Sequence, residues 1–211
     1  MVEKKIKLND AYSLKTPEDS IDLYKKWAQT YDEDFAVSSN YRSPKEISNF
    51  FNKYSKNTDT PILDVGAGTG LVGEILNSRR EKNIIGIDIS PEMLDQAKTK
   101  GCYSSLVAAD ITKKIPFEDN SIGAVVSAGT FTHGHVGPEA FNELLRITKP
   151  GGLFVLSINS KVFIKNGFKE KFLNINNKIS PPIFKEFNAH AKQQNEAFNE
   201  VKIIASIFRK K

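Results

Sequence analysis

The sequence of residues 61–73 is PILDVGAGTGLVG, and this stretch decides the expected fold. Residues 62–65 form a short apolar run of the kind found in buried strands, and a cluster of glycines ends it. From Leu71 onward, apolar residues recur at helical spacing. A strand that passes through glycines into a helix lets a ligand approach the backbone closely at the helix N-terminus. The stretch therefore predicts an α/β fold with a ligand-binding turn.

The same pattern of a strand followed by a helix recurs along the chain. Further strand-sized apolar runs lie at residues 84–88, 106–110, 122–128 and 153–158. Their alternation with helical patterns predicts right-handed crossovers and a parallel sheet that is covered on both faces. Beyond residue 160 we expect a helix at 161–174 and two final strands at 183–190 and 201–208. The expected fold is therefore a doubly wound α/β sheet of seven strands, mostly parallel.

The residues before the first strand have a different character. Residues 1–15 are polar and are expected to form an arm. Thr16 and the proline after it indicate the start of a helix, with the hydroxyl as its cap. Residues 43–46, Ser-Pro-Lys-Glu, match a capping box that opens a second helix. We therefore divide the chain into an N-terminal arm with a helical lid, residues 1–58, and a ligand-binding domain, residues 59–211.

The composition is that of one globular domain. The chain has 211 residues and a formal net charge of +5, which suffices for a single α/β core and indicates no strong polyanion affinity. Basic residues gather at both ends of the chain, in Lys4, Lys5, Lys7, Arg209, Lys210 and Lys211. We interpret these ends as solubilising, with a weak affinity for nucleic acid or another polyanion as the alternative.

Cysteine use and hydropathy indicate the compartment. Cys102 is the only cysteine, so an intrachain disulfide is excluded and a reducing compartment fits. The N-terminus lacks the apolar core of a secretory signal, and the longest apolar runs are strand-sized. We therefore expect a soluble, cytoplasmic protein without a membrane segment. The sequence does not indicate the oligomeric state.

The glycine-rich turn fits two kinds of ligand. Residues 68–73 spell G-x-G-x-x-G, the dinucleotide fingerprint, so an NAD(P)-dependent oxidoreductase is one alternative. Asp64 weighs against it, because a negative charge just before the glycines would repel a pyrophosphate and attract a cation. The next two strands also end in acids, Asp88 and Asp110, and ligands bind where the carboxyl ends of parallel strands meet. We expect three carboxylates around a cationic ligand.

Three segments resemble motifs of one enzyme superfamily. The sequence LDVGAGTG at 63–70 resembles motif I of the class I methyltransferases that depend on S-adenosylmethionine (SAM). The sequence GIDISPEML at 86–94 resembles the second strand and following helix of that superfamily, and LLRITKPGG at 144–152 resembles the lead into its fifth strand. The resemblance covers residues 60–160 and implies a Rossmann-like fold with methyltransferase activity.

A further resemblance lies before the first strand. The sequence WAQTYDED at 27–34 resembles the Trp-Ala-x-x-Tyr-Asp segment of the Williams–Beuren-region methyltransferase-like family and of some bacterial small-molecule methyltransferases. In such proteins the segment lies over the cofactor. Aromatic faces attract a sulfonium cation, which gives Tyr24, Trp27 and Tyr31 a reason to be there. The alternative is ordinary packing of a helix face on the domain.

The superfamily resemblance implies how SAM, and its product S-adenosylhomocysteine, would be held. Asp88 would bind the ribose hydroxyls, because a carboxylate can accept from both. Asp110 would accept from the adenine amino group. The remaining residues that the resemblance assigns surround the methionine part and the methyl group, namely Asp64, Gly66, Ala67, Gly68, Gly70, Ser127 and Ala128, or the adenine, namely Ile89, Met93 and Ile111.

Methyl transfer from a sulfonium is a direct displacement, so the protein mainly aligns the reactants. A base can help where the nucleophile carries a proton. His133 and His135 lie on a glycine-containing loop past the fourth strand, and we assign them as base or substrate-orienting residues. The alternative is that both are loop histidines bonded to backbone. No metal site is expected, because no nearby cysteine or acid completes a ligand set.

The acceptor is less defined than the cofactor. No Asn-Pro-Pro-Tyr type of sequence follows the fourth strand, and no nucleic-acid-binding module is visible. We therefore expect a small-molecule acceptor, with a protein side chain second and nucleic acid not expected. A catalytically silent SAM-binding protein is a further alternative.

Overall fold

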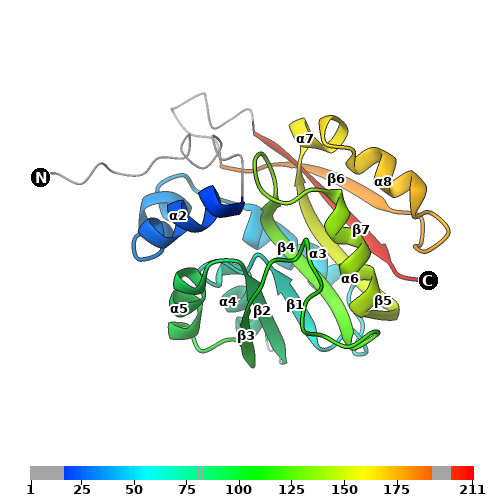
Figure 1. The fold of residues 1–211 in the computed structure, drawn as a ribbon, viewed down its shortest axis with the longest axis horizontal. Helices are drawn as coiled ribbons and strands as arrows, with labels where there is room; N and C mark the ends of the chain where they lie inside the picture. The colour runs from blue at the N-terminus through cyan, green and yellow to red at the C-terminus, as the bar shows by residue number, and fades with distance from the viewer. Residues whose placement is uncertain (1–16, 80, 82, 192–200) are drawn as a thin grey trace, which may run out of the picture.

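The computed structural model describes residues 17–79, 81, 83–191 and 201–211. The arm expected at residues 1–15 and the cap expected at Thr16 lie outside these described residues. One sheet runs through the described part of the molecule, with helices on both of its faces and the N-terminal helix at one end (Figure 1).

The sheet has seven strands in the order β3-β2-β1-β4-β5-β7-β6. The strands are β1 Ile62–Val65, β2 Ile84–Asp88, β3 Ser105–Ala108, β4 Ile122–Phe131, β5 Thr148–Asn159, β6 Ile183–Asn188 and β7 Lys202–Arg209. Strands β1 to β5 pair in parallel, and β7 runs antiparallel to both β5 and β6. The prediction of a mostly parallel, Rossmann-like sheet of seven strands is confirmed, with the antiparallel strands at one edge.

Helices cover the sheet in two layers. One layer contains α3 Ser43–Tyr54 and α4 Leu71–Ser78, and the other contains η2 Pro138–Ala140, α6 Phe141–Ile147, α7 Ser160–Lys165 and α8 Phe168–Asn174. Helix α5, Pro91–Thr99, packs along β2 and β3. The N-terminal helix α2, Pro17–Trp27, and the π-helical turn η1, Asp32–Val37, lie apart from these layers and form a small aromatic cluster. Helix α3, although it precedes residue 58, packs directly on the sheet.

Alternation along the strands sends neighbouring side chains into different layers. Leu63 and Val65 of β1 pack in the core beside α6 and α8, whereas Ile62 packs beside α3 and α4. Successive side chains of a strand point to opposite faces. Asp64, between Leu63 and Val65, therefore points into the α3 and α4 layer, where it is fully buried.

Two local expectations are wrong. The helix expected at 161–174 is two helices, because Gly167 adopts a left-handed conformation, φ +81°, that separates α7 from α8. The capping box at residues 43–46 does not form. Arg42 is the N-cap and its guanidinium pairs with Glu46, while the buried hydroxyl of Ser43 has no hydrogen-bond partner among the described residues.

The basic residues at the end of β7 take part in the structure. The Arg209 guanidinium donates to both carboxylate oxygens of Asp59, at 2.8 and 3.0 Å, and Asp59 is only 4% exposed. Lys210 Nζ donates to the Asn120 amide oxygen and the Thr148 carbonyl. The interpretation of these two residues as a solubilising tail is wrong. The antiparallel return of β7 brings Arg209 beside the loop that precedes β1, and Lys210 beside the starts of β4 and β5.

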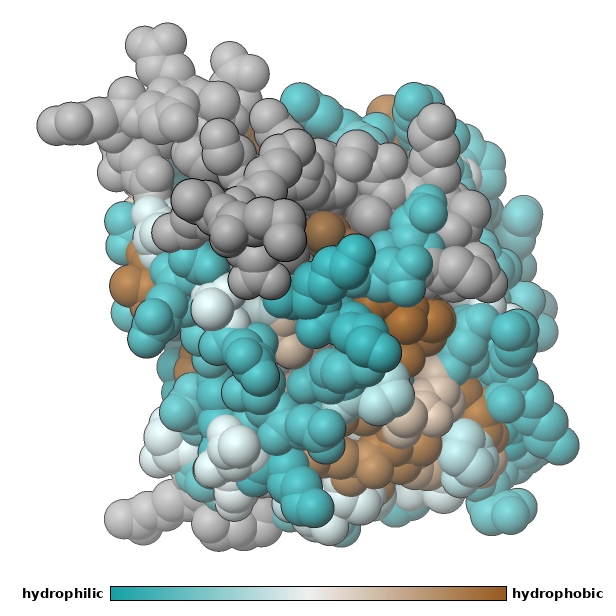
Figure 2. Space-filling model, turned by 60° about the vertical axis from the view of Figure 1, so that its left-hand side comes forward, coloured by the Kyte–Doolittle hydropathy of each residue, from teal (hydrophilic) through white to brown (hydrophobic). Residues whose placement is uncertain are grey.

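Within the described ranges, no helix has the length and apolar character to cross a bilayer. Figure 2 shows the side of the molecule on which α2 and α5 lie. Among the residues coloured by hydropathy on this side, hydrophilic ones cover the larger area and hydrophobic ones gather in a smaller one.

We predict that Arg209→Met lowers the free energy of unfolding by about 3 kcal/mol, because it leaves the buried Asp59 carboxylate without its cation. Urea unfolding followed by circular dichroism measures the change. Lys202→Met, which removes a cation from an exposed pair on the same strand, is the control and should cost under about 1 kcal/mol. Equal losses in the two variants would contradict the prediction.

Candidate cofactor site

A cavity lies at the carboxyl ends of β1 to β4. It encloses about 1050 Å³ of empty space, including the part that is open to solvent. The strand order reverses between β1 and β4, and ligands of open α/β sheets bind at such a switch point. Tyr24 of α2 and Tyr31, just before η1, line the cavity from the N-terminal side. The position therefore fits the ligand-binding turn expected from the sequence.

The structure brings most of the predicted site residues to this cavity. Those that line it are Tyr24, Tyr31, Gly66, Ala67, Gly68, Asp88, Ile89, Met93, Asp110, Ile111, Ala128 and His135. Five predicted residues are not part of its lining, namely Trp27, Asp64, Gly70, Ser127 and His133. Sequence reasoning missed several lining residues, among them Tyr41, Thr69, Thr112, Thr130 and Val136. The hydroxyl-rich end of β4 was missed because the strand was expected to stop at residue 128.

The glycine-rich turn keeps its backbone open toward the cavity. Gly66 has a φ of +65°, and a Cβ there would lie 2.0 Å from the Thr130 hydroxyl oxygen, so only glycine fits. Gly68 has a φ of +54°, but its nearest neighbour is the Met93 methyl at 3.7 Å. The space in front of Gly68 is therefore available to a ligand that approaches the backbone.

Hydroxyl groups of β4 support the end of β1. Ser127 Oγ and Thr130 Oγ1 both donate to the Val65 carbonyl, at 2.8 and 2.9 Å. Ser127 is fully buried. The resemblance placed Ser127 at the methyl-donor end of the site, whereas the structure places it beneath the turn as a support.

Asp88 is held in place by the turn itself. Its Oδ2 accepts from the Gly68 amide at 2.8 Å, and its Oδ1 accepts from the Ser90 amide at 2.9 Å. Burial raises the pKa of Asp88, and the two backbone hydrogen bonds oppose that rise. Each carboxylate oxygen can accept a second hydrogen bond. Asp88 can therefore receive hydroxyl donors from a ligand without leaving the turn.

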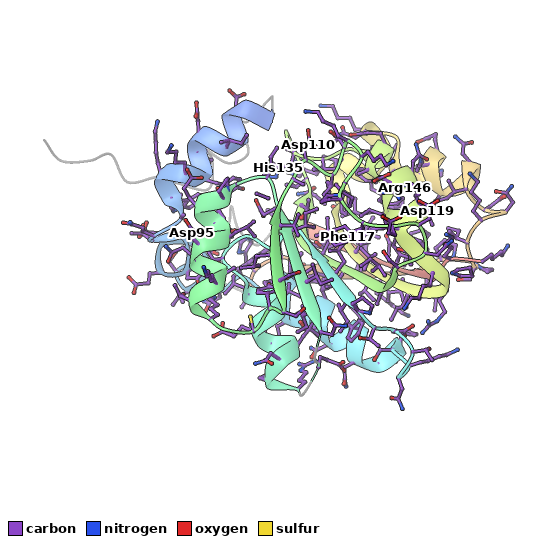
Figure 3. All side chains as sticks on the ribbon, turned by 60° about the horizontal axis from the view of Figure 1, so that its bottom comes forward. Asp95, Asp110, Phe117, Asp119, His135 and Arg146 are labelled. Atoms are coloured by element: carbon purple, nitrogen blue, oxygen red, sulfur yellow. The ribbon has the colours of Figure 1, made fainter. Side chains whose placement is uncertain are left out.

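Asp110 lies two residues beyond the end of β3, rather than inside the strand as expected. Its Oδ1 accepts from the Thr112 amide and hydroxyl, and its Oδ2 pairs with Lys113 at 3.2 Å. Burial alone would raise the pKa of Asp110, but the contacts with Thr112 and Lys113 outweigh it and lower the pKa. Figure 3 shows Asp110 and His135 at the same end of the sheet, and Asp95 on α5 away from both.

Asp64 does not take the place expected of it. Its Oδ2 accepts from the Tyr103 hydroxyl at 2.7 Å, and its Oδ1 has no hydrogen-bond partner among the described residues. Burial raises its pKa to about 7, against the opposing effect of the Tyr103 hydrogen bond. The expectation of three carboxylates around the ligand is therefore wrong. Two line the cavity, and strand alternation turns the third into the α3 and α4 layer.

Tyr103 explains two glycines of the dinucleotide fingerprint, Gly70 and Gly73. A Cβ on Gly73, the last glycine of G-x-G-x-x-G, would lie 2.3 Å from the Tyr103 ring. A Cβ on Gly70 or Gly86 would also crowd that ring, at 3.0 and 3.1 Å. The Tyr103 hydroxyl accepts from the Gly73 amide at 3.2 Å. The glycine pattern here makes room for a tyrosine, so it is weak support for a dinucleotide.

Asp32 fastens the N-terminal segment to the turn. Its Oδ1 accepts from the Thr69 hydroxyl at 2.5 Å, and its Oδ2 pairs with Lys100 Nζ at 2.8 Å. Thr69 belongs to the glycine-rich turn, and Lys100 follows α5. The segment that carries Tyr24 and Tyr31 is therefore held over the cavity by contacts with the turn.

The two loop histidines differ in position. His135 lines the cavity, and its Nε2 lies 3.4 Å from the Tyr24 hydroxyl. Burial lowers the pKa of His135 to about 4, so the ring is neutral at pH 7. His133 lies outside the lining, and burial together with Lys161 and Lys165 lowers its pKa. Over the part of the chain that the structure describes, no group of three His, Cys, Asp or Glu side chains is arranged to hold a metal.

Comparison with known proteins finds similarity to methyltransferases. The family described as Methyltransferase domain matches residues 63–156. Methyltransferase-like protein 27 of Homo sapiens is 31% identical over 158 residues, which are 74% of this chain and 64% of that protein. The 18S rRNA (guanine(1575)-N(7))-methyltransferase of Saccharomyces cerevisiae is 32% identical over 111 residues, 47% of this chain and 40% of that protein. The chain spans less than two thirds of either relative.

A solved structure shares the fold. The TehB-like SAM-dependent methyltransferase from Corynebacterium glutamicum has a TM-score of 0.62 and 19% identity, over 89% of this chain and 98% of that chain. These similarities and the shared fold support the expected class, the class I SAM-dependent methyltransferases. The resemblance to the Williams–Beuren-region family is supported by the human relative, which is a member of it.

We predict that Asp64 makes the protein less stable as the pH rises from 4 to 7. The folded state holds the Asp64 proton up to a pKa of about 7, whereas an unfolded carboxyl loses it near pH 4. Over that window the contribution falls by up to about 1.4 kcal/mol per pH unit. Urea unfolding of the wild type and of Asp64→Asn at several pH values measures the slope.

In Asp64→Asn the free energy of unfolding should depend less steeply on pH, because the amide does not titrate. Asp95→Asn, which changes an exposed carboxylate of α5, is the matched control and should keep the wild-type slope. If the free energy of unfolding of Asp64→Asn depends on pH as steeply as that of the wild type, Asp64 is not the source of the pH dependence.

Proposed function

We propose that this protein transfers a methyl group from SAM, bound in the cavity beside the glycine-rich turn, to a small-molecule acceptor. The observation that carries the proposal is the charge of the lining. Two carboxylates, Asp88 and Asp110, line the cavity, and no lysine or arginine does so among the described residues. A site for a pyrophosphate would need donors or cations at this place, whereas a sulfonium and an ammonium group are favoured by carboxylates.

The residues present fit the parts of SAM. The open backbone at Gly68 leaves room for the methionine part, and Asp88 is oriented to accept from ribose hydroxyls. Ile89, Met93 and Ile111 supply an apolar wall suited to adenine. Tyr24 and Tyr31 offer aromatic faces, which attract a sulfonium. Asp110 would serve as the acceptor for the adenine amino group, in addition to its present contacts with Thr112.

The chemistry needs little from the protein beyond alignment. The acceptor's lone pair forms the bond to the methyl carbon, the electrons of the broken carbon–sulfur bond stay on sulfur, and the acceptor's proton passes to solvent. His135 is neutral and lies on the cavity wall beside Tyr24. It can therefore orient the acceptor by a hydrogen bond, which makes it the better candidate of the two histidines.

The alternatives are distinguished by binding and by turnover. The yeast relative is named for an 18S rRNA guanine, so nucleic acid enters as an acceptor class to be tested beside proteins and small molecules. A catalytically silent protein would bind SAM and transfer no label to any of the three. An NAD(P)-dependent oxidoreductase would bind NAD(P)H and ignore SAM.

We predict that Asp88→Asn weakens SAM binding by about 1–3 kcal/mol, because one acceptor oxygen and the negative charge are lost. Isothermal titration calorimetry with SAM and with S-adenosylhomocysteine measures the change. Asp95→Asn, which removes a carboxylate from α5 outside the cavity, is the control and should bind as the wild type does. Wild-type binding of NADPH with no heat from SAM would refute the proposed cofactor.

We predict that His135→Ala lowers kcat by about tenfold or more and that His133→Ala has the smaller effect. The assay uses the first acceptor that a screen of small molecules with methyl-labelled SAM identifies. Because the pKa of His135 is about 4, the wild-type rate should not titrate near pH 6.5 through this residue. A larger loss of kcat in His133→Ala than in His135→Ala would make His133, and not His135, the better candidate for orienting the acceptor.

A further inference from the structure

A second, smaller cavity adjoins the cofactor cavity on its N-terminal side. It encloses about 540 Å³, including its open part. The two cavities share five lining residues, namely Tyr24, Tyr31, Tyr41, Gly129 and His135. A molecule in the smaller cavity would therefore face the larger one across the same ring of side chains.

Aromatic rings line much of the smaller cavity. Besides the shared tyrosines, Trp27, Phe35 and Phe131 line it. The rings support one another, since Trp27 lies 5.0 Å from Tyr31 and 5.8 Å from Phe35, between ring centroids and in edge-to-face contact. Trp27 and Phe131 are nearly or fully buried. The walls are thus fixed by packing and offer flat apolar surfaces, which suit a planar ligand.

One polar atom of this wall is left unsatisfied. Nε1 of Trp27 is buried and has no hydrogen-bond partner among the described residues. An indole N–H is a donor only, and a buried donor without an acceptor is costly. By contrast, the Ser157 hydroxyl, which is also part of this wall, accepts a hydrogen bond from the Gly129 amide. A ligand that brings an acceptor atom would relieve the Trp27 donor.

The charge of the wall limits what can bind. No aspartate, glutamate, lysine or arginine lines the smaller cavity within the described ranges, and His135 is neutral at pH 7. A charged ligand would lose its hydration without gaining a counter-ion, a cost that contact of a cation with the aromatic faces offsets only in part. An ammonium group would also lack the lone pair that methyl transfer requires.

We propose that the smaller cavity is the acceptor pocket and that it selects a compact, uncharged aromatic molecule whose oxygen or ring nitrogen accepts a hydrogen bond from Trp27 Nε1. This inference rests on the proposed function, because it places the acceptor beside a methyl donor. It deepens that function by naming the class of acceptor.

Trp27 is the only tryptophan of the chain, so its indole N–H gives a single signal in a ¹H–¹⁵N spectrum. The full chain is first titrated with S-adenosylhomocysteine alone. Four probes of similar size are then added with and without that product: acetophenone, ethylbenzene, benzoate and benzylammonium. The first carries an acceptor atom, the second carries none, and the last two are charged. Spectra and calorimetry record the indole shift and the affinity.

We expect acetophenone to shift the indole signal and to bind at least about tenfold more tightly than benzoate or benzylammonium. Trp27→Phe should weaken the binding of acetophenone by about five- to tenfold and the binding of ethylbenzene clearly less, because only acetophenone loses a hydrogen bond. Tyr54→Phe, which removes a hydroxyl from an aromatic ring outside both cavities, is the control and should leave the affinities unchanged.

Three outcomes overturn the inference: an indole signal that no probe moves, charged probes that bind as well as acetophenone, or equal losses for acetophenone and ethylbenzene in Trp27→Phe. If S-adenosylhomocysteine binds in the first titration and any of these outcomes follows, the acceptor pocket is refuted while the proposed function stands. If S-adenosylhomocysteine does not bind, the proposed function itself fails.

Discussion

The hydrogen bond between the Tyr103 hydroxyl and the buried Asp64 carboxyl is the contact on which the site is built. The Tyr103 ring fits beneath the turn only because residues 70, 73 and 86 are glycines without a side chain. One ring thereby joins the end of β1, the first turns of α4 and the middle of β2. Because Tyr103 supports the turn from below, the backbone at Gly68 is left free to meet a ligand above it.

The site above that turn is divided into two chemically different parts. The sheet contributes carboxylates at the ends of β2 and β3, whereas the N-terminal segment contributes aromatic rings. Asp32 belongs to the N-terminal segment and joins it to the sheet. Its carboxylate accepts a hydrogen bond from Thr69 of the turn and pairs with Lys100, the residue that follows α5. The position of Tyr24 and Tyr31 over the cavity therefore depends on polar contacts at its rim as well as on packing within the aromatic cluster.

The features that could be predicted from the sequence are those that depend on residues close together in the chain. Three local patterns predicted the sheet and most of the cavity lining. They are the strand, turn and helix from residue 62 onward, the alternation of strands and helices, and the acids at the strand ends. The burial of Asp64 could not be predicted, because it depends on which helical layer covers each face of β1. The pairing of Arg209 with Asp59, 150 residues apart, and the place of Trp27 in a second cavity are likewise set by the tertiary fold.

The place of β7 in the sheet has a consequence for synthesis on the ribosome. β7 pairs with both β5 and β6, yet it follows both in the chain. While the chain emerges, β6 has no neighbour to pair with, and β5 presents an open row of backbone donors and acceptors. Unpaired edges of this kind invite association with other chains. The nascent protein is therefore most exposed to aggregation, and most in need of a chaperone, in the interval before residues 202–209 leave the exit tunnel.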